Sequence, residues 1–204
     1  MRDFFTDRMW WLLAIWNMLF AFAVGSIGLH LAPMMQDRGL SLAQAASVLS
    51  IVGLGGFIGN LGAGWLVDRV SATRLARIFV LAPLGAVLLL YFGSGMAVAV
   101  TAAVLLGVFN GGDHALSAFL ARRYFSAQTF GRASATQQVA TACGSGTAPW
   151  LSGLIHDRTG SYDLALVMSI AAFLLAVVSA WMLPEFRPGS ASTDTDPEPQ
   201  VQKL

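Results

Sequence analysis

The chain has 204 residues, of which 56% are apolar and only 11% are charged, and its mean hydropathy is +0.65. A soluble globular domain carries about 25% charged residues, so this composition argues against a water-soluble fold. The net charge of +1 gives no reason to expect a nucleic-acid partner.

The apolar residues gather in six runs that short polar segments separate. Each run is close to the roughly 20 residues that a helix needs to cross a bilayer, and the period-2 alternation of a membrane β-barrel is missing. We therefore predict an all-α membrane protein with six transmembrane helices in residues 9–184, a cytoplasmic segment at 1–8 and a disordered cytoplasmic tail at 185–204. The runs are Met9–Leu31, Ala43–Val67, Leu75–Phe92, Met96–Leu120, Ala133–Ile155 and Leu164–Leu183.

The basic residues sort into alternate loops when the six runs are threaded through a membrane. Only Arg38 and Arg158, of the twelve lysines and arginines, fall in the loops of one side. Because basic residues concentrate in cytoplasmic loops, we predict that both termini are cytoplasmic and that the membrane is the bacterial inner (plasma) membrane. A cleavage pattern at Ala21-Phe22-Ala23 suggests a signal peptide, but the apolar run continues well beyond it, so we expect the first helix to be retained.

The first run and the loop after it carry recognisable helix signals. Asn17 is the one strongly polar residue in the middle of the first run, and either an interhelical hydrogen bond or a polar cavity would explain it. Pro33 disfavours continuation of that helix. Gly39 suits a turn, and Ser41 is a plausible N-cap for the second helix.

The second run is rich in glycine. Gly55 and Gly59 stand four residues apart on one helical face, as do Gly56 and Asn60. In water, glycine costs a helix roughly 1 kcal/mol relative to alanine. In lipid, bare backbone lets a neighbouring helix approach closely, so we predict a tight helix contact along this run.

Polarity divides the six runs into two groups. The third and sixth are almost wholly apolar, and we predict that they are outer helices. Polar side chains inside hydrocarbon tend to face protein or water, so the other four helices should face inward. Their polar residues are Asn17, Asn60, Asn110, Asp113, His114, Gln137, Gln138, Thr141 and Ser145.

Asp113 is the strongest candidate for chemistry. A carboxylate inside a membrane helix costs about 2.5–3.5 kcal/mol on insertion scales. Asn110 and His114 lie within one turn of Asp113 on the fourth run, and Gln137 and Thr141 lie at a comparable depth on the fifth. We expect these residues to form the floor of a substrate or proton path; the alternative is a buried carboxylate that amides hold to lock helix packing.

The segment between the second and third runs resembles a cytoplasmic-loop motif of the major facilitator superfamily. The motif residues here are Gly64-x-x-x-Asp68-Arg69 followed by Arg74, with Ser71 where a second glycine is usual. Further segments resemble the monocarboxylate and oxalate–formate carriers of that superfamily. They are His30-Leu-x-Pro33, Asp37-x-Gly39-Leu-Ser41, Ala121-Arg122-Arg123-Tyr124-Phe125, Phe130-Gly131 and Gly153-x-x-x-Asp157-x-x-Gly160-Ser161-Tyr162.

This resemblance implies alternating-access transport of a small solute, such as a monocarboxylate or another organic anion, coupled to protons. Such carriers consist of two six-helix bundles, each of two three-helix repeats, with the substrate cavity between them. The chain resembles the second bundle only, so the resemblance implies a partner: a separate first half or a second copy. It also implies a gating role for Gly64, Asp68, Arg69 and Arg74 and a path through Asn17, Asn60, Asn110, Asp113, His114, Gln137 and Thr141. Asn60 departs from the carboxylate carriers, which often have a basic residue there.

Two other functions fit the sequence less well. The chain could be a half-carrier that folds without transporting, or a membrane scaffold. Ser145, between two glycines, could be the nucleophile of an intramembrane hydrolase with His114 as its base, although small residues at that spacing usually serve helix packing. Cys143 is the one cysteine and no histidines have metal-ligand spacing, so we expect no disulfide, metal or cofactor.

Overall fold

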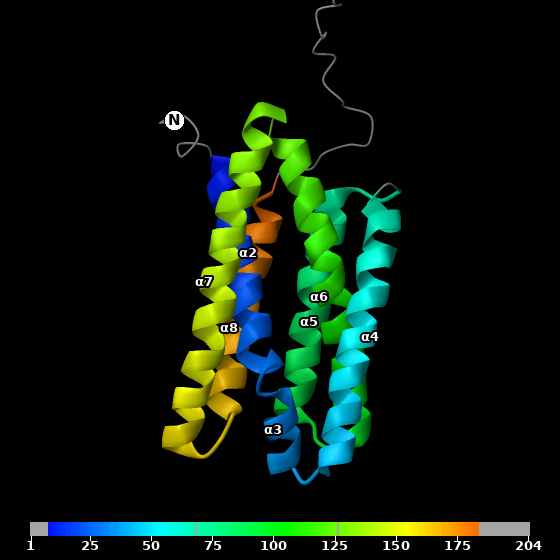
Figure 1. The fold of residues 1–204 in the computed structure, drawn as a ribbon, viewed down its shortest axis with the longest axis vertical. Coiled ribbons are helices and arrows are strands. Elements are labelled where there is room, and N and C mark those ends of the chain that lie inside the picture. Colours follow the sequence, from blue (N-terminus) through cyan, green and yellow to red (C-terminus); the bar gives the residue numbers. More distant parts are fainter. Residues whose placement is uncertain (1–7, 68, 126, 184–204) are drawn as a thin grey trace, which may run out of the picture.

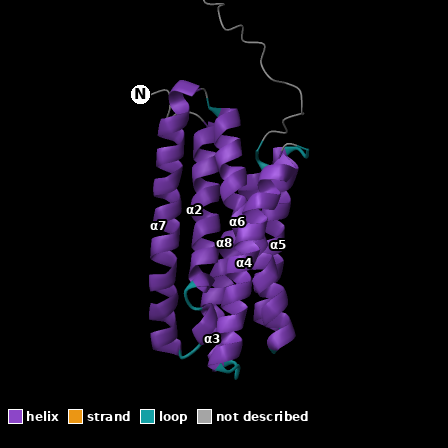
Figure 2. Cartoon of the chain, turned by 45° about the vertical axis from the view of Figure 1, so that its right-hand side comes forward, coloured by secondary structure: helices purple, strands orange, loops and turns teal. Residues whose placement is uncertain are grey.

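The computed structural model describes residues 8–67, 69–125 and 127–183, and every regular element within them is a helix (Figure 2). Asp68, the predicted tail at 185–204 and all of the predicted segment 1–8 except Arg8 lie outside the described residues. The helices are α2 (Arg8–Gly28), α3 (Leu31–Asp37), α4 (Leu42–Val67), α5 (Ala72–Phe92), α6 (Met96–Tyr124), α7 (Ala127–Thr159) and α8 (Asp163–Trp181).

Six of these helices correspond to the six predicted spans. Among the described residues, α2, α4, α5, α6 and α8 are long and apolar enough to cross a membrane. The fifth predicted span, α7, has 33 residues and is about 50 Å long at 1.5 Å per residue, more than the roughly 30 Å hydrocarbon core requires. Its polar residues keep it outside the apolar group.

The loop after the first span differs from the prediction, because Pro33 lies inside the short helix α3. Proline is tolerated there, since the first turn of a helix does not need its N–H. The predicted turn and cap are confirmed: Gly39 has a φ of +89°. The Ser41 hydroxyl accepts a hydrogen bond from the Gln44 N–H at 3.3 Å, and the Gln44 side chain accepts one from the Ser41 N–H at 2.9 Å.

In chain order the six long helices form two sets of three, α2–α4–α5 and α6–α7–α8, and the two sets pack into each other (Figure 1). The second helix of each set packs on the first helix of the other, so α4 lies along α6 and α7 lies along α2. The third helices, α5 and α8, contact each other and the first helices α6 and α2. The turns between α4 and α5 and between α6 and α7, near which most of the described arginines lie, are at one end, and the turns after α3 and α7, near Arg38 and Arg158, are at the other (Figure 1).

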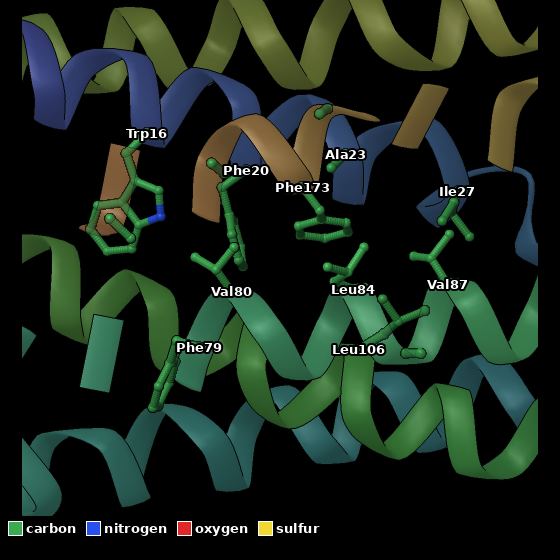
Figure 3. Close-up of a cluster of buried hydrophobic side chains, with 14 of the residues drawn as sticks. Trp16, Phe20, Ala23, Ile27, Phe79, Val80, Leu84, Val87, Leu106 and Phe173 are labelled. Atoms are coloured by element: carbon green, nitrogen blue, oxygen red, sulfur yellow. The ribbon is translucent and has the colours of Figure 1, made fainter. Parts of the chain in front are cut away.

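The predicted outer position of the third and sixth helices stays a prediction about the complete carrier, but within this bundle both helices are well buried. Half of the apolar stretch of α5 and 44% of that of α8 is buried, against 22% for α4. Phe173 of α8 lies with Val80, Leu84 and Val87 of α5 and meets Phe20 of α2 edge to face (Figure 3). Their low polarity therefore reflects their place in the core of this bundle, while α4 and α7 are less covered.

The helix pair α4–α6 is in direct backbone contact at glycine, as the sequence predicted. A Cβ added at Gly59 would fall on the carbonyl of Val108, and one added at Gly111 would fall on the carbonyl of Gly56. Gly55 also lies against Gly107. A Cβ added at Gly55 would be 3.2 Å from the Gly107 Cα. Glycine is required on both helices because any side chain here would push them apart.

We predict that Gly59→Ala destabilises the bundle by about 1–3 kcal/mol, since overpacking forces backbone to move. Gly62→Ala is the matched control, because an added Cβ there meets nothing within 4 Å on the same helix. Thermal unfolding of the purified variants in detergent, followed by tryptophan fluorescence, measures the difference. Equal melting temperatures for the Gly59 variant and the wild type would contradict the close contact.

Candidate functional site

A polar cavity of about 120 Å³ lies between α2, α6 and α7. Its residues come from the half of the bundle nearer the arginine-rich end, and α4, α5 and α8 contribute none. The structure thus gathers six of the seven predicted path residues around one space. The lining consists of Asn17, Phe20, Ala21, Asn110, Asp113, His114, Ser117, Ala118, Ala121, Ser134, Gln137, Gln138 and Thr141.

Asn17, Asp113 and Gln137 are the buried polar residues of this lining. Their exposed fractions are 6%, 6% and 4%. The Asp113 Oδ1 and the Gln137 Nε2 have no hydrogen-bond partner within the described part of the chain. Because buried polar atoms are normally paired, these two atoms leave one acceptor and one donor, on residues that line the cavity, without a partner in this part of the chain.

Asn17 makes an interhelical hydrogen bond and also lines the cavity, which are the two alternatives that the sequence left open. Its Nδ2 donates to the Leu13 carbonyl at 2.8 Å, and its Oδ1 accepts from the Ser117 hydroxyl at 2.8 Å. The second bond joins α2 to α6 at the edge of the cavity. Asn17 therefore fixes the distance between two walls and has less free hydrogen-bonding capacity than Asp113.

Sequence reasoning missed Ser117 and Ser134, and it did not include Gln138 among the path residues. Ser117 lies four residues after Asp113, which puts it on the same helical face, and this spacing could have identified it. Ser134 stands three residues before Gln137 on α7, where the same rule applies. Each is a hydroxyl that adds a donor and an acceptor to the cavity.

Asn60 does not line this cavity, and its assignment to the path stays a prediction. It is exposed on α4, and α4 contributes no residue to the lining. Successive residues of a helix are about 100° apart, so the packing of Gly59 on α6 turns Asn60 to a different side.

The predicted gating loop lies at the arginine-rich end, away from the cavity lining. The Arg69 guanidinium lies over the Trp65 ring, 3.8 Å from its centroid, a cation–π contact that the sequence did not predict. Ser71 has φ −59° and ψ 128°, a conformation open to any residue, so the turn does not need the usual glycine. Gly64 and Arg74 are exposed, and Asp68 is outside the described residues.

The hydrolase alternative gains no support from the site. Ser145 does not line the cavity that contains His114, and its hydroxyl donates to the Ala142 carbonyl at 3.5 Å. A Cβ added at the neighbouring Gly144 would fall on the Met18 carbonyl of α2. The small residues of this stretch thus serve the contact between α7 and α2.

His30 and His156 lie outside the cavity. They connect α3 with α7 and α8 at the end opposite the arginine-rich one. The His30 Nε2 lies 2.9 Å from the Pro149 carbonyl, and the His156 Nε2 lies 3.2 Å from the Asp37 carboxylate. The Tyr162 ring stacks on His156 at 4.2 Å. Burial, with the carboxylates of Asp37 and Asp157, raises the pKa of Tyr162, so its hydroxyl stays neutral at physiological pH.

The described residues hold no group of three histidine, cysteine or acidic side chains that could bind a metal ion. Cys143 is exposed. Within this part of the chain the chemistry of the cavity is that of one carboxylate, amides, hydroxyls and an imidazole.

Solved transporter structures share the fold. A mutant of the peptide transporter POT in complex with sulfate superposes with a TM-score of 0.77 and 16% identity over 84% of this chain. The Escherichia coli fucose:proton symporter FucP gives a TM-score of 0.74 and 20% identity over 86% of it. A structure of FucP in the outward conformation gives the same TM-score.

The chain spans only 37% of the POT chain and 42% of the FucP chain. It therefore matches less than half of each of these transporters. No curated protein matches it.

The fold is shared with membrane transporters, and the five apolar spans of the described residues fit an integral membrane protein. A sequence-family model, Major Facilitator Superfamily, matches residues 2–203. This match covers nearly the whole chain and agrees with the all-α bundle and its transporter-like fold. The chain belongs to the major facilitator superfamily.

Proposed function

We propose that this chain is one half of a carrier that moves a small solute across the membrane by alternating access and couples that movement to protons. The observation that carries the proposal is Asp113, a buried carboxylate whose Oδ1 is unpaired on the wall of a polar cavity. A second six-helix bundle, either another copy or a separately encoded half, completes the carrier. The chain's match to 37–42% of two transporters supports this.

Asp113 is suited to take up and release a proton. An ionisable side chain within a membrane span is costly and marks ion or substrate pathways. Asp113 lines the polar cavity together with Asn110 and His114 of the same helix. A proton bound here neutralises the carboxylate before the bundle changes conformation, so charge does not have to cross hydrocarbon.

The similarity to a fucose:proton symporter is consistent with proton coupling, although it establishes the fold alone. The organic-anion substrate that the sequence resemblance implied meets a difficulty. Among the described residues, no arginine or lysine lines the cavity. An anion would need a cation supplied by the second bundle.

We predict that Asp113→Asn abolishes proton-coupled uptake, because the amide cannot exchange the proton. Proteoliposomes loaded with a pH-sensitive dye report lumen acidification when neutral, anionic or cationic small solutes are added outside. The solute that acidifies wild-type vesicles is then applied to the variant, and the rate should fall at least about tenfold, or 1.4 kcal/mol.

Ser152→Ala is the control for this experiment. Ser152 is also buried with an unpaired hydroxyl, but it does not line the cavity, so its loss should leave the rate unchanged. Wild-type acidification by the Asp113 variant would end the proposed role of this carboxylate.

The proposed orientation has a separate test in living bacteria. The arginine-rich loops should lie in the cytoplasm, so green fluorescent protein fused after Leu204 should fluoresce. Alkaline phosphatase fused after Gly95, in the turn between α5 and α6, should be active because that turn faces outward. A non-fluorescent green fluorescent protein fusion together with an inactive alkaline phosphatase fusion would show the opposite topology.

A further inference from the structure

The walls of the cavity are unsuited to an anionic solute. The charged residue among them is Asp113, and the remaining polar lining consists of amides, hydroxyls and His114. While Asp113 is ionised, a carboxylate solute would enter a site of reduced dielectric beside another carboxylate, where like charges repel strongly. No lysine or arginine of the described residues lies in the lining to offset this repulsion.

The two unpaired buried atoms specify a chemistry more closely. The Asp113 Oδ1 accepts hydrogen bonds and the Gln137 Nε2 donates them. A hydroxyl both donates and accepts, so hydroxyl groups satisfy both atoms. An ammonium group has donors only and leaves the Gln137 N–H unpaired, whereas a carboxylate accepts only and leaves an ionised Asp113 unpaired.

The size of the cavity limits what this bundle holds. A volume of about 120 Å³ has room for several water molecules. The neighbouring hydroxyls of Ser117, Ser134 and Thr141 extend the polar surface beyond the two unpaired atoms. The site therefore fits a few hydroxylated carbons more closely than a large apolar group.

We infer that the cavity binds a small, uncharged, hydroxyl-rich solute, whose hydroxyl groups donate to Asp113 and accept from Gln137. The inference rests on the proposed function and names its substrate class. It replaces the organic anion of the sequence resemblance by a neutral polyol-like molecule. Asp113 then contacts the solute as well as the proton, and Gln137 is the residue that sets specificity against amines.

Three four-carbon probes of different charge test the inference: erythritol, butyrate and 1,4-diaminobutane. The purified full-length chain in detergent is mixed with each probe, and saturation-transfer NMR measures binding. Erythritol should bind, and the two charged probes should bind at least about tenfold more weakly, because each leaves a buried polar atom unpaired.

Two site variants and one control tie the result to the site. Asp113→Leu should abolish erythritol binding, and Ser152→Ala should not change it. Gln137→Glu replaces the donor by a second carboxylate, so it should lose erythritol and gain 1,4-diaminobutane. A misfolded protein cannot show that exchange of specificity.

Stronger binding of butyrate or 1,4-diaminobutane to the wild type overturns the inferred substrate class, and so does binding of none of the three. Erythritol binding that survives both Asp113→Leu and Gln137→Glu places the solute elsewhere and also overturns it. If erythritol binds as expected but Asp113→Asn leaves proton-coupled uptake intact, the proposed coupling fails while the substrate class stands.

Discussion

Backbone contact at glycine is the constraint on which the geometry of the bundle depends. Gly59 and Gly111 let α4 and α6 touch where any Cβ would collide with a carbonyl, and Gly144 does the same for α7 against α2. In lipid the hydrophobic effect does not hold helices together, so close packing has to do so. The same contacts fix the rotation of α6 and α7 about their axes. That rotation decides which of their side chains line the cavity.

Most of the buried apolar core lies outside the lining of the polar cavity. Phe173 of α8 and the apolar face of α5 pack beside Phe20 of α2 (Figure 3), and of these only Phe20 also lines the cavity. The hydrogen bond from Ser117 to Asn17 then joins α2 and α6 beside the cavity. Asp113 and Gln137 are thus buried by the packing of the helices, without partners of their own. An unpaired carboxylate and an unpaired amide are costly in such a place, which is the physical reason to look for a solute there.

Periodicity within each helix made much of this predictable. The run lengths predicted the spans, the four-residue spacing of Gly55 and Gly59 predicted a close contact, and the depth of Asp113 and Gln137 placed them at one level. That periodicity does not show which helices are neighbours or how far apart they lie. Asn60 was therefore grouped with residues whose cavity it does not line, and Ser117 was overlooked although it bonds to Asn17. The burial of α5 and α8 was missed for a related reason, because low polarity marks lipid-facing and core helices alike.

The exposed surface of α4 gives the half-carrier proposal a physical basis. This helix is the least buried of the five apolar spans, and it exposes Phe57, Leu61 and Trp65 together with Asn60. Apolar side chains can face lipid at little cost, so they do not require a partner. The amide of Asn60 is different, because in hydrocarbon it loses the hydrogen bonds that water would supply. A second bundle that covered α4 could restore those bonds, and the chain's match to less than half of each similar transporter leaves room for one.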